Sequence, residues 1–440
     1  MLEPSWYNGA PVVAAVPGGS MKRGFYTIMA AQFFSSLADN ALLIAAIALL
    51  VEMHAPDWMK PLLKLFFTIS YVLLAPFVGA FADSMPKGRV MFITNLIKVS
   101  GCALMFFTIH PLLAYAVVGF GAAAYSPAKY GILTELLPPE KLVAANGWIE
   151  GTTVGSIILG TVLGGALISP AVSGFLLAAD FPGIDTGVDT PAEAAILVIA
   201  AVYALAATFN LRIPDTGARY PDQERNPLRL VGEFAHCCAV LWKDRLGQIS
   251  LAVTTLFWGA GATLQFIVLE WARTALGMPL NKAAVLQGVV AVGIAVGAVV
   301  AARFIPLRGA LRVLPVGIAM GVLVPTITLV SSLGPAYPML VLIGALAGFF
   351  VVPMNALLQH RGHVLMSAGH SIAVQNFNEN LNVLLMLGLY ALLIGAGLHI
   401  YLIIVMFGSF VALTMFFVLL RHRANQREFD AEATLPQAGH

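Results

Sequence analysis

Residues 24–51 read GFYTIMAAQFFSSLADNALLIAAIALLV, and Asp39 is the one charged residue in this stretch of 28. A helix of that length rises about 42 Å at 1.5 Å per residue, and about 20 apolar residues suffice to cross the hydrocarbon core of a bilayer. The stretch is therefore long and apolar enough to span a membrane. Eleven further apolar runs follow it, so the sequence predicts an all-α membrane protein.

The twelve expected transmembrane helices are separated by polar breaks. They fall at about 24–51, 61–82, 89–109, 112–136, 142–169, 191–211, 249–272, 283–304, 310–332, 336–358, 370–397 and 399–420. The longest polar connector, Pro214 to Arg245, divides them into two groups of six. The expected parts are a cytosolic leader at 1–21, a six-helix bundle at 22–213, a cytoplasmic linker at 214–246, a second six-helix bundle at 247–421 and a cytosolic tail at 422–440.

The composition excludes several classes of protein. Of the 440 residues, 59% are hydrophobic and 10% are charged, whereas soluble domains carry about 25% charged residues. The net charge of +2 gives no basis for nucleic-acid binding, and the three cysteines fit neither a disulfide framework nor a zinc site. No phosphate-binding loop and no nucleophile-elbow motif is present. We therefore expect a protein that is not an enzyme and that uses no cofactor and no metal.

The placement of basic residues predicts the orientation. With both termini on one side of the membrane, 18 of the 24 Lys and Arg residues fall on that side, and such an excess marks the cytoplasm. The largest loop on the other side is acidic; it contains Asp180, Asp185, Asp189 and Glu193. Residues 1–20 lack the basic n-region and apolar segment of a signal peptide. We expect both termini to be cytoplasmic.

Five charged residues lie deep within the expected spans. They are Asp39, Lys98, Lys129, Glu150 and Glu379. An ionisable group in a membrane costs at least a few kcal/mol on insertion scales, so it generally faces a cavity or a partner. We expect Asp39, followed by Asn40, to contact a headgroup or a lysine; a buried acid satisfied by its own bundle is the alternative.

The two lysines admit different interpretations. Lys129 follows Tyr125 and Pro127, and the proline removes a backbone donor from the helix, which favours an anion-binding spot. A lysine that extends to the membrane surface is the alternative. Lys98 shares a helix face with Asn95 at i, i+3. For Lys98, an ion pair that holds helices together explains the sequence at least as well as a phosphate contact.

Two other expected spans carry polar stripes. Asn146 and Glu150 share one face of 142–169, and Gln375 and Glu379 share one face of 370–397, each pair at i, i+4. Asn355 follows Pro353 as Lys129 follows Pro127, about half the chain apart. These offsets indicate a weak parallel repeat of six spans. We expect the stripes to line a wet cavity, with a polar seam between helices as the alternative.

The remaining spans supply weaker candidates. Gln265 lies midway along its span and is expected to face the cavity, whereas Glu270 with Arg273 is expected to form an exposed pair near the outer end. Five glycines in 142–169 form two rows, of three and of two, each at four-residue spacing, and we interpret them as sites of close helix packing. They are Gly147, Gly151, Gly155, Gly160 and Gly164.

One loop resembles a superfamily signature. Gly79-x-x-x-Asp83 followed by Lys87-Gly88-Arg89 is similar to the Gly-x-x-x-Asp…Gly-Arg loop of the major facilitator superfamily, with an Asp-to-Gly spacing two residues longer. The resemblance implies the major facilitator fold, in which the substrate site lies near the midplane between the two halves. We expect Gly79, Asp83 and Arg89 to form a conformational latch; ordinary positive-inside topology is the alternative.

Several phrases resemble the bacterial lysophospholipid transporter family. They are ADNALL at 38–43, APFVG at 75–79, AAAYSPAKYGIL at 122–133, LFWGAG at 256–261, GFFVVP at 348–353, NALLQ at 355–359 and AVQN at 373–376. The resemblance implies that lysophosphatidylethanolamine and related lipids move from the outer to the inner leaflet of the bacterial inner membrane, for reacylation by a cytoplasmic acyl-carrier-protein synthetase and acyltransferase. It places Asp39 and Lys129 at the charged site, and Gln265 where the family has a basic residue.

We therefore expect a monomeric flippase that works by alternating access. Lys129, with Lys98, would hold the phosphate, and Asp39, Glu150 or Glu379 would meet an ammonium group or a lysine. The alternative is a proton-coupled exporter or symporter of small polar or drug-like solutes, with those three acids as proton carriers. A structural membrane subunit is a third reading, but it would not need five charges at similar depths.

Overall fold

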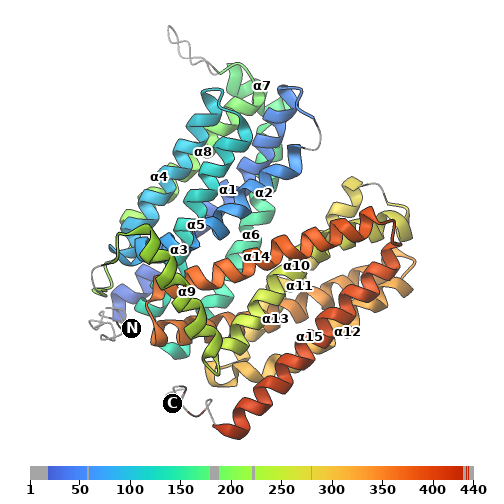
Figure 1. Ribbon diagram of the computed structural model, residues 1–440. Helices are drawn as coiled ribbons and strands as arrows, with labels where there is room; N and C mark the ends of the chain where they lie inside the picture. Colours follow the sequence, from blue (N-terminus) through green and yellow to red (C-terminus); the bar gives the residue numbers. More distant parts are fainter. Residues whose placement is uncertain are drawn as a thin grey trace. The chain divides into compact units, whose positions relative to one another are not determined.

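The computed structural model describes residues 18–56, 59–178, 188–220, 223–278, 280–429, 433 and 435, and these form helices and no strand (Figure 1). The α-helices are α1 (Gly18–Glu52), α2 (Met59–Leu73), α3 (Ala75–Asp83), α4 (Lys87–Phe106), α5 (Pro111–Leu136), α6 (Leu142–Leu167), α7 (Pro170–Ala178), α8 (Pro191–Leu211), α9 (Pro227–Lys243), α10 (Gly247–Leu276), α11 (Leu280–Phe304), α12 (Leu314–Leu323), α13 (Leu333–Leu365), α14 (Ala368–Gly395) and α15 (Ile400–Glu428). Short 3-10 helices are η2 (Pro139–Lys141), η3 (Leu307–Val313) and η4 (Val324–Leu329).

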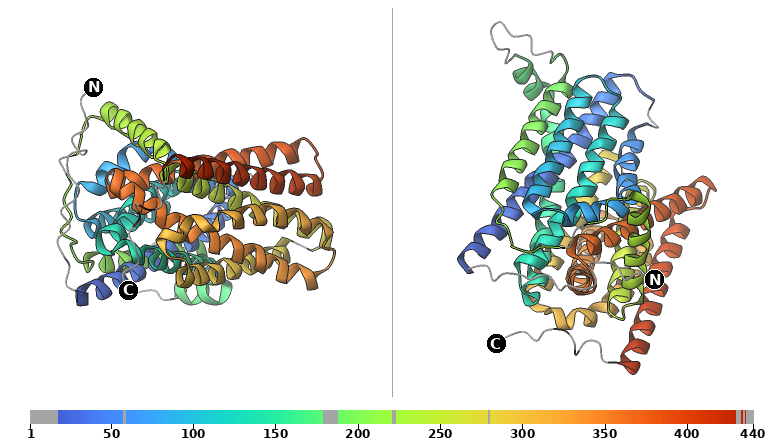
Figure 2. Two further views of the ribbon diagram at one scale, coloured as in Figure 1. Left: turned by 90° about the horizontal axis from the view of Figure 1, so that it is seen from below. Right: turned by 60° about the vertical axis from the view of Figure 1, so that its left-hand side comes forward.

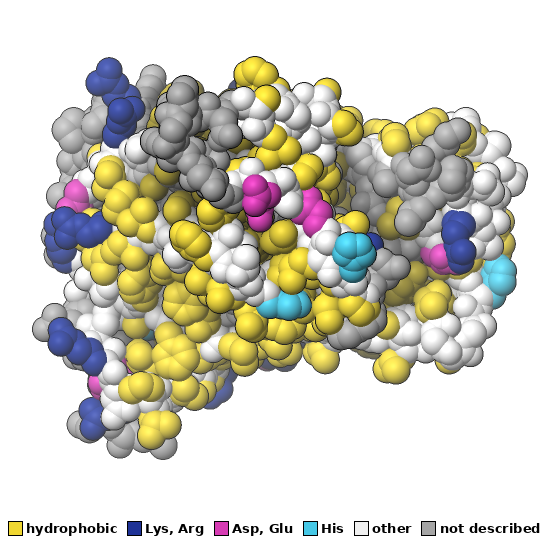
Figure 3. Space-filling view, turned by 90° about the horizontal axis from the view of Figure 1, so that it is seen from above, with side chains coloured by type: hydrophobic (Ala, Val, Ile, Leu, Met, Phe, Trp, Pro, Cys, Tyr) yellow, Lys and Arg dark blue, Asp and Glu magenta, His cyan; other side chains and the backbone are white. Residues whose placement is uncertain are grey.

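The predicted set of spans is confirmed. Within the described residues, eleven helical segments are long and apolar enough to cross a membrane, and a bent pair, α2 with α3, brings the number to twelve. A membrane core offers no water to backbone N–H and C=O groups, so a chain of this composition satisfies them within helices. Hydrophobic side chains accordingly cover much of the surface in Figure 3, where charged groups stand in small separate clusters.

The second span is broken, which the sequence analysis did not predict. α2 and α3 meet at an angle of 66°, and Pro76 stands in the first turn of α3. Its ring lacks an N–H and clashes with the carbonyl four residues earlier, so the helix cannot continue straight. By contrast, α5 continues through Pro127 and α13 through Pro353.

The polar connector also differs from expectation, because it contains an amphipathic helix. In α9, Leu230, Phe234, Cys237 and Leu241 recur on one face and are buried, whereas Leu228 on another face is exposed. The expected leader and tail are shortened as well, since α1 begins at Gly18 and α15 continues to Glu428. The acidic outer loop falls largely outside the described residues, apart from the start of α8. There, Thr190 and Glu193 form a reciprocal capping box.

The chain forms two compact units. Unit 1 comprises Met1–Leu136, Gly155–Phe234 and Ala368–Ala373, and unit 2 comprises Leu137–Val154, Ala235–Ser367 and Val374–His440. The boundaries of these units fall within α6, α9 and α14 and in the segment before η2. The first half of α6 belongs to unit 2 and its second half to unit 1, while the first six residues of α14 belong to unit 1.

Glycines allow helices to approach closely within each unit. In unit 2, α11 and α13 pack along Gly293, Gly297, Gly344 and Gly348, where an added Cβ would lie 1.9–2.3 Å from a backbone oxygen of the facing helix. α12 and α15 also lie side by side (Figure 2). In unit 1, α1 and α8 contribute to a hydrophobic core that consists largely of alanine, leucine and isoleucine side chains. Tyr203 of α8 is fully buried in this core.

The glycines of α6 fall into two classes. A Cβ at Gly160 or Gly164 would lie 2.5–2.7 Å from a backbone oxygen of α1, and one at Gly147 would lie 2.5 Å from Ala302. These three therefore pack closely, as expected. Among the described residues, Gly151 and Gly155 have nothing within 4 Å of a Cβ position, so the packing interpretation is wrong for this pair.

Candidate functional site

Unit 1 contains a buried ion pair between α1 and α4. The Lys98 ammonium lies 2.9 Å from the Asp39 carboxylate; the lysine side chain is 1% exposed and the aspartate 20%. Lys98 also donates to Ser35 Oγ at 3.0 Å, and the Tyr203 hydroxyl donates to Asp39 at 2.6 Å. Asp39 therefore has a lysine partner, and that partner is Lys98.

Unpaired hydrogen-bond donors lie beside this ion pair. The ring of Tyr125 is 5.1 Å from the Lys98 ammonium, and the buried Tyr125 hydroxyl has no hydrogen-bond partner among the residues that the structure describes. The Asn95 side chain accepts from Ser35 through Oδ1, but its buried Nδ2 donates to no acceptor in the described part of the chain. An unsatisfied buried donor costs about 1–3 kcal/mol. A lysine and two free donors together favour an anionic acceptor that accepts from all three.

Lys129 and Asn40 are two further polar candidates of unit 1, each with a contact close to it in the sequence. The Lys129 ammonium is 4.2 Å from the centre of the Tyr130 ring, and the residue is half-buried. Asn40 donates to the Ser36 carbonyl at 2.8 Å within its own helix. Lys129 is thus the more exposed of the two lysines, whereas Lys98 is enclosed.

Unit 2 contains a buried network of amides and carboxylates from α6, α13 and α14. Gln375 donates to Glu379 at 2.7 Å and to Asn355 at 3.1 Å, and Asn355 donates to Glu150 at 3.4 Å. All four side chains are buried. The i, i+4 pairing on α14 was predicted, but the bridge through α13 was not, because it joins residues far apart in the sequence.

Further amide contacts lie near this buried network or elsewhere in unit 2. Asn146 exchanges two hydrogen bonds of 2.9 Å with Gln359 of α13, a residue that the sequence analysis had not singled out as a candidate. Asn382 donates to the Thr255 carbonyl at 2.8 Å. Gln265 is exposed, and its backbone oxygen accepts from Gln287 at 3.3 Å. Glu270 and Arg273 form the expected exposed ion pair at 2.6 Å, which makes them suitable controls.

The expected latch residues meet at one end of unit 1. Asp83 accepts from the backbone N–H of Gly369 at 3.0 Å, and its carboxylate lies 3.0 Å from His370 Nδ1. A Cβ at Gly79 would lie 2.9 Å from the His370 backbone, so the glycine permits this approach. Arg89 is exposed, contrary to a central role. The basic side chain that pairs with Asp83 in the buried cluster is Lys87.

The loop after α8 covers the same cluster. Glu135, buried at the end of α5, lies 3.5 Å from the Lys87 ammonium. It accepts from the Thr216 hydroxyl at 2.8 Å and from the Tyr220 hydroxyl at 2.9 Å. Burial raises the pKa of Tyr220 above its ordinary value, so the phenol is a neutral donor at physiological pH. The linker is therefore fixed to unit 1 at this point.

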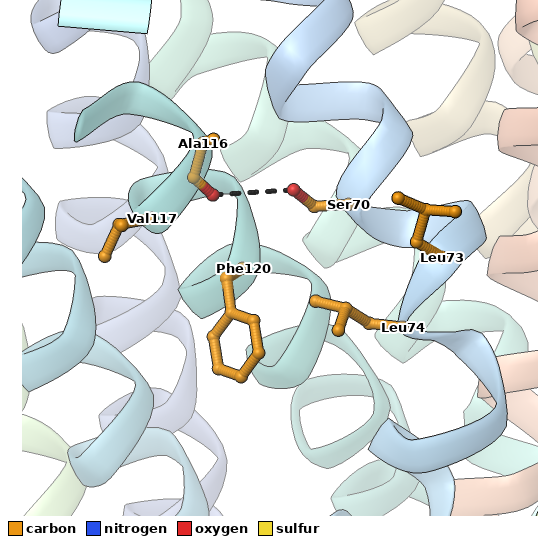
Figure 4. A pocket seen from close by; sticks show the side chains of 6 residues that line it. All are labelled: Ser70, Leu73, Leu74, Ala116, Val117 and Phe120. Carbon is orange, nitrogen blue, oxygen red and sulfur yellow. Dashed lines mark hydrogen bonds between the residues drawn. The ribbon is translucent and has the colours of Figure 1, made fainter. Parts of the chain in front are cut away.

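An apolar groove lies where α2 breaks, between α2 and α5 (Figure 4). It encloses about 290 Å³, and its side chains are apolar apart from Ser70, which donates to the Ala116 carbonyl at 3.4 Å. Phe120 lines this groove. Lys129 is nine residues further along α5, about 180° around the helix at 100° per residue. The groove and Lys129 therefore lie on opposite faces of α5.

Comparisons with known proteins identify the family. Residues 28–381 match the profile of the Major Facilitator Superfamily. The lysophospholipid transporter LplT of Yersinia enterocolitica is 44% identical over 381 residues, which cover 86% of this chain and 89% of that protein. The chain belongs to the lysophospholipid transporter family of the major facilitator superfamily. LplT of Yersinia pestis strain Pestoides F is likewise 44% identical over 378 residues. These residues cover 86% of this chain and 88% of that protein.

Solved structures share the fold at low sequence identity. The human organic anion transporter MFSD10 has a TM-score of 0.71 at 16% identity and covers 92% of this chain and 100% of its own. The transporter FucP has a TM-score of 0.68 at 16% identity, over 92% of this chain and 99% of its own. The major facilitator fold and the class of non-enzymatic transporter, both predicted from the sequence, are confirmed.

Proposed function

We propose that this protein is a lysophospholipid flippase. It would move lysophosphatidylethanolamine and related lipids from the outer to the inner leaflet of the bacterial inner membrane by alternating access. The observation that carries the proposal is the buried Asp39–Lys98 pair with unpaired donors beside it, in a chain whose relatives are named lysophospholipid transporters. Such a cluster is costly in a membrane protein unless a ligand uses it.

The phosphate of the headgroup is the ligand that fits these donors. A phosphodiester carries one negative charge and accepts several hydrogen bonds, so it satisfies the Tyr125 hydroxyl and Asn95 Nδ2 and competes with Asp39 for Lys98. Lys129, which is more exposed, would attract the headgroup first. Asp39 would then keep Lys98 charged and oriented when no lipid is bound.

The buried amide network of unit 2 is a second candidate for contact with polar groups of a substrate. Glycerol and ethanolamine carry hydroxyl and ammonium donors, and the amides Asn146, Asn355 and Gln375 offer oxygen acceptors near two carboxylates. Gln265 is exposed and uncharged, so it would contribute at most a hydrogen bond. The single acyl chain would rest on apolar helix surface and enter sideways from the bilayer.

The surrounding biology follows from the same proposal. Both termini would be cytoplasmic, because the basic residues concentrate on that side. Lipid delivered to the inner leaflet would serve an acyl-carrier-protein synthetase and acyltransferase in the cytoplasm, and the transporter would act as a monomer. Asp83, with Gly79 and the start of α14, would act as the conformational latch that holds one state closed.

The test is translocation in liposomes. Purified protein is reconstituted, labelled lysophosphatidylethanolamine is placed in one leaflet, and its appearance in the other is timed. We expect the lipid to move between leaflets only when the protein is present. If it does not move, the proposal of lysophospholipid transport is refuted. Lys129→Ala should slow the movement far more than Glu270→Ala does, since Glu270 lies in an exposed pair with Arg273. Equal effects of the two variants would discredit the site assignment.

A further inference from the structure

Lys64 of α2 is a charged residue that the sequence analysis did not select for the site. It lies about 7.5 Å along the helix from Met59, the first residue of α2. Its side chain is exposed, and its ammonium lies 5.5 Å from the centre of the Phe67 ring. A lysine that extends to the nearby membrane surface would point toward the start of the helix. The Lys64 ammonium instead lies over the next turn, deeper in the helix.

Lys64 does not belong to the lipid-facing stripe of α2. Exposed apolar side chains recur at four-residue spacing and mark that stripe; they are Leu65, Ile69 and Leu73. Lys64 lies about 140° around the helix from Ile69, the middle of the stripe, at 3.6 residues per turn. Tyr71 lies within about 20° of Lys64 by the same measure. Lys64 is therefore exposed on a different face of α2, which it shares with Tyr71.

This second face is directed toward the Asp39 site. The charges of Lys64 and Asp39 interact electrostatically, and Tyr71 also interacts with Asp39. The Phe67 ring lies 5.5 Å from the Tyr115 ring, and the Tyr115 hydroxyl donates to the Asp39 carbonyl at 3.4 Å. Asp39 lies about 20 Å from the end of α1, whereas Lys64 lies about 7.5 Å from the start of α2. Lys64 is thus nearer than Asp39 to the end of unit 1 where α1 gives way to α2.

The charges in this part of unit 1 leave room for an anion. Asp39 is already paired with Lys98 at 2.9 Å and accepts from Tyr203, so Lys64 adds a second cation beside one carboxylate. Among the described residues, Lys64 forms no ion pair of its own. A cation within a spanning helix is costly unless it has a role. A phosphodiester would balance it, because it carries one negative charge and several acceptor oxygens.

We propose that Lys64 binds the phosphate of the lipid headgroup, as a further binding residue beyond the Asp39–Lys98 pair. The inference rests on the proposed lysophospholipid transport, and with both termini cytoplasmic Lys64 lies on the side of the outer leaflet. A phosphate that approaches Asp39 from that side passes Lys64, and a charged donor binds it more strongly than a neutral one. The Tyr71 hydroxyl, on the same face, is a second donor for the headgroup.

The first measurement tests whether position 64 faces water and is covered by bound lipid. Lys64→Cys and Leu65→Cys are made in a Cys238→Ala background, because Cys102 and Cys237 are buried. A water-soluble methanethiosulfonate should label Lys64→Cys about tenfold faster than Leu65→Cys, because the reactive thiolate forms in water and not in lipid. Lysophosphatidylethanolamine should slow the labelling of Lys64→Cys. Equal rates for the two variants, or no protection by the lipid, would overturn the proposal.

The second measurement is equilibrium binding of labelled lysophosphatidylethanolamine to the purified protein in detergent. Lys64→Gln should weaken binding about tenfold, the value of one charge-assisted hydrogen bond, and Lys64→Arg should retain most of the affinity. Arg273→Gln removes another cation, from the exposed pair with Glu270, and should bind as the wild type does. A monoacylglycerol, which lacks the phosphate, should bind Lys64→Gln and the wild type equally. Equal affinities of these two proteins for the lysophospholipid would overturn the proposal.

The remaining outcomes separate this inference from the proposed function. Excess inorganic phosphate should leave the labelled lipid bound, because the acyl chain contributes to its affinity; displacement would assign a free phosphate to Lys64 and overturn the lipid assignment. Lipid binding that depends on Lys64, without lipid movement in liposomes, would refute transport and support the inference. Lipid movement and binding that are the same in Lys64→Gln and the wild type would support transport and refute the inference.

Discussion

Removing the positive charge of Lys98 tests the ion pair at the centre of unit 1. In Lys98→Met, the chain keeps a side chain of similar length, but Asp39 loses its counter-charge at 2.9 Å. Breaking one side of a buried pair costs about 3–5 kcal/mol. Asp39 is 20% exposed and keeps the hydrogen bond from Tyr203, so we expect the lower end, about 3 kcal/mol.

Thermal unfolding in detergent measures this cost. At an unfolding entropy of about 2.1 cal/mol/K per residue, 3 kcal/mol over 440 residues lowers Tm by about 3 °C. The double variant Asp39→Asn, Lys98→Met removes both charges and should recover most of that loss, while transport stays impaired. Lys141→Met changes an exposed lysine and serves as the control. A Tm of Lys98→Met equal to that of the wild type would refute the reasoning. So would a Tm of the double variant no higher than that of Lys98→Met.

Three further predictions address other parts of the chain. Gly160→Ala should destabilise the protein by about 2 kcal/mol, because the new Cβ would lie 2.5 Å from a backbone oxygen of α1, whereas Gly151→Ala faces open space and should be neutral in the same thermal assay. Asp83→Asn should raise maleimide labelling of a cysteine placed at the buried position Ser371, since it weakens the contact with the start of α14; unchanged labelling would argue against the latch. Burial raises the pKa of Cys238 to about 11, so its alkylation by iodoacetamide, followed by mass spectrometry, should rise about tenfold per pH unit between pH 7 and 10; a rate already at its maximum at pH 8 would contradict this.

The sequence predicted the spans well because the membrane imposes a simple pattern. Each crossing needs about 20 apolar residues, and the apolar runs lie within a few residues of the helices observed. The prediction of a continuous helix failed where a proline interrupts an apolar run. The second span breaks at Pro76. Pro127 also lacks a backbone N–H, yet α5 continues through it without a break. The presence of a proline therefore does not by itself decide whether a helix breaks.

The contacts among the candidate residues were only partly predictable from the sequence. Helical spacing put Gln375 and Glu379 on one face, and the structure confirms that contact. The partnership of Asp39 with Lys98 joins residues 59 positions apart, and no periodicity within one helix indicates it. The glycine pairs of α11 and α13 repeat at the same four-residue spacing as the glycine rows of α6, so the sequence does contain a signal for this close packing.

The measurement that tests the central claim most directly compares two lipids with one headgroup. Lysophosphatidylethanolamine and diacyl phosphatidylethanolamine, each labelled, are placed in one leaflet of liposomes containing the wild-type protein, and both translocation rates are followed. The account predicts protein-dependent movement of the lysolipid and little or none of the diacyl lipid. Equal rates for the two would indicate a general scramblase and contradict the account.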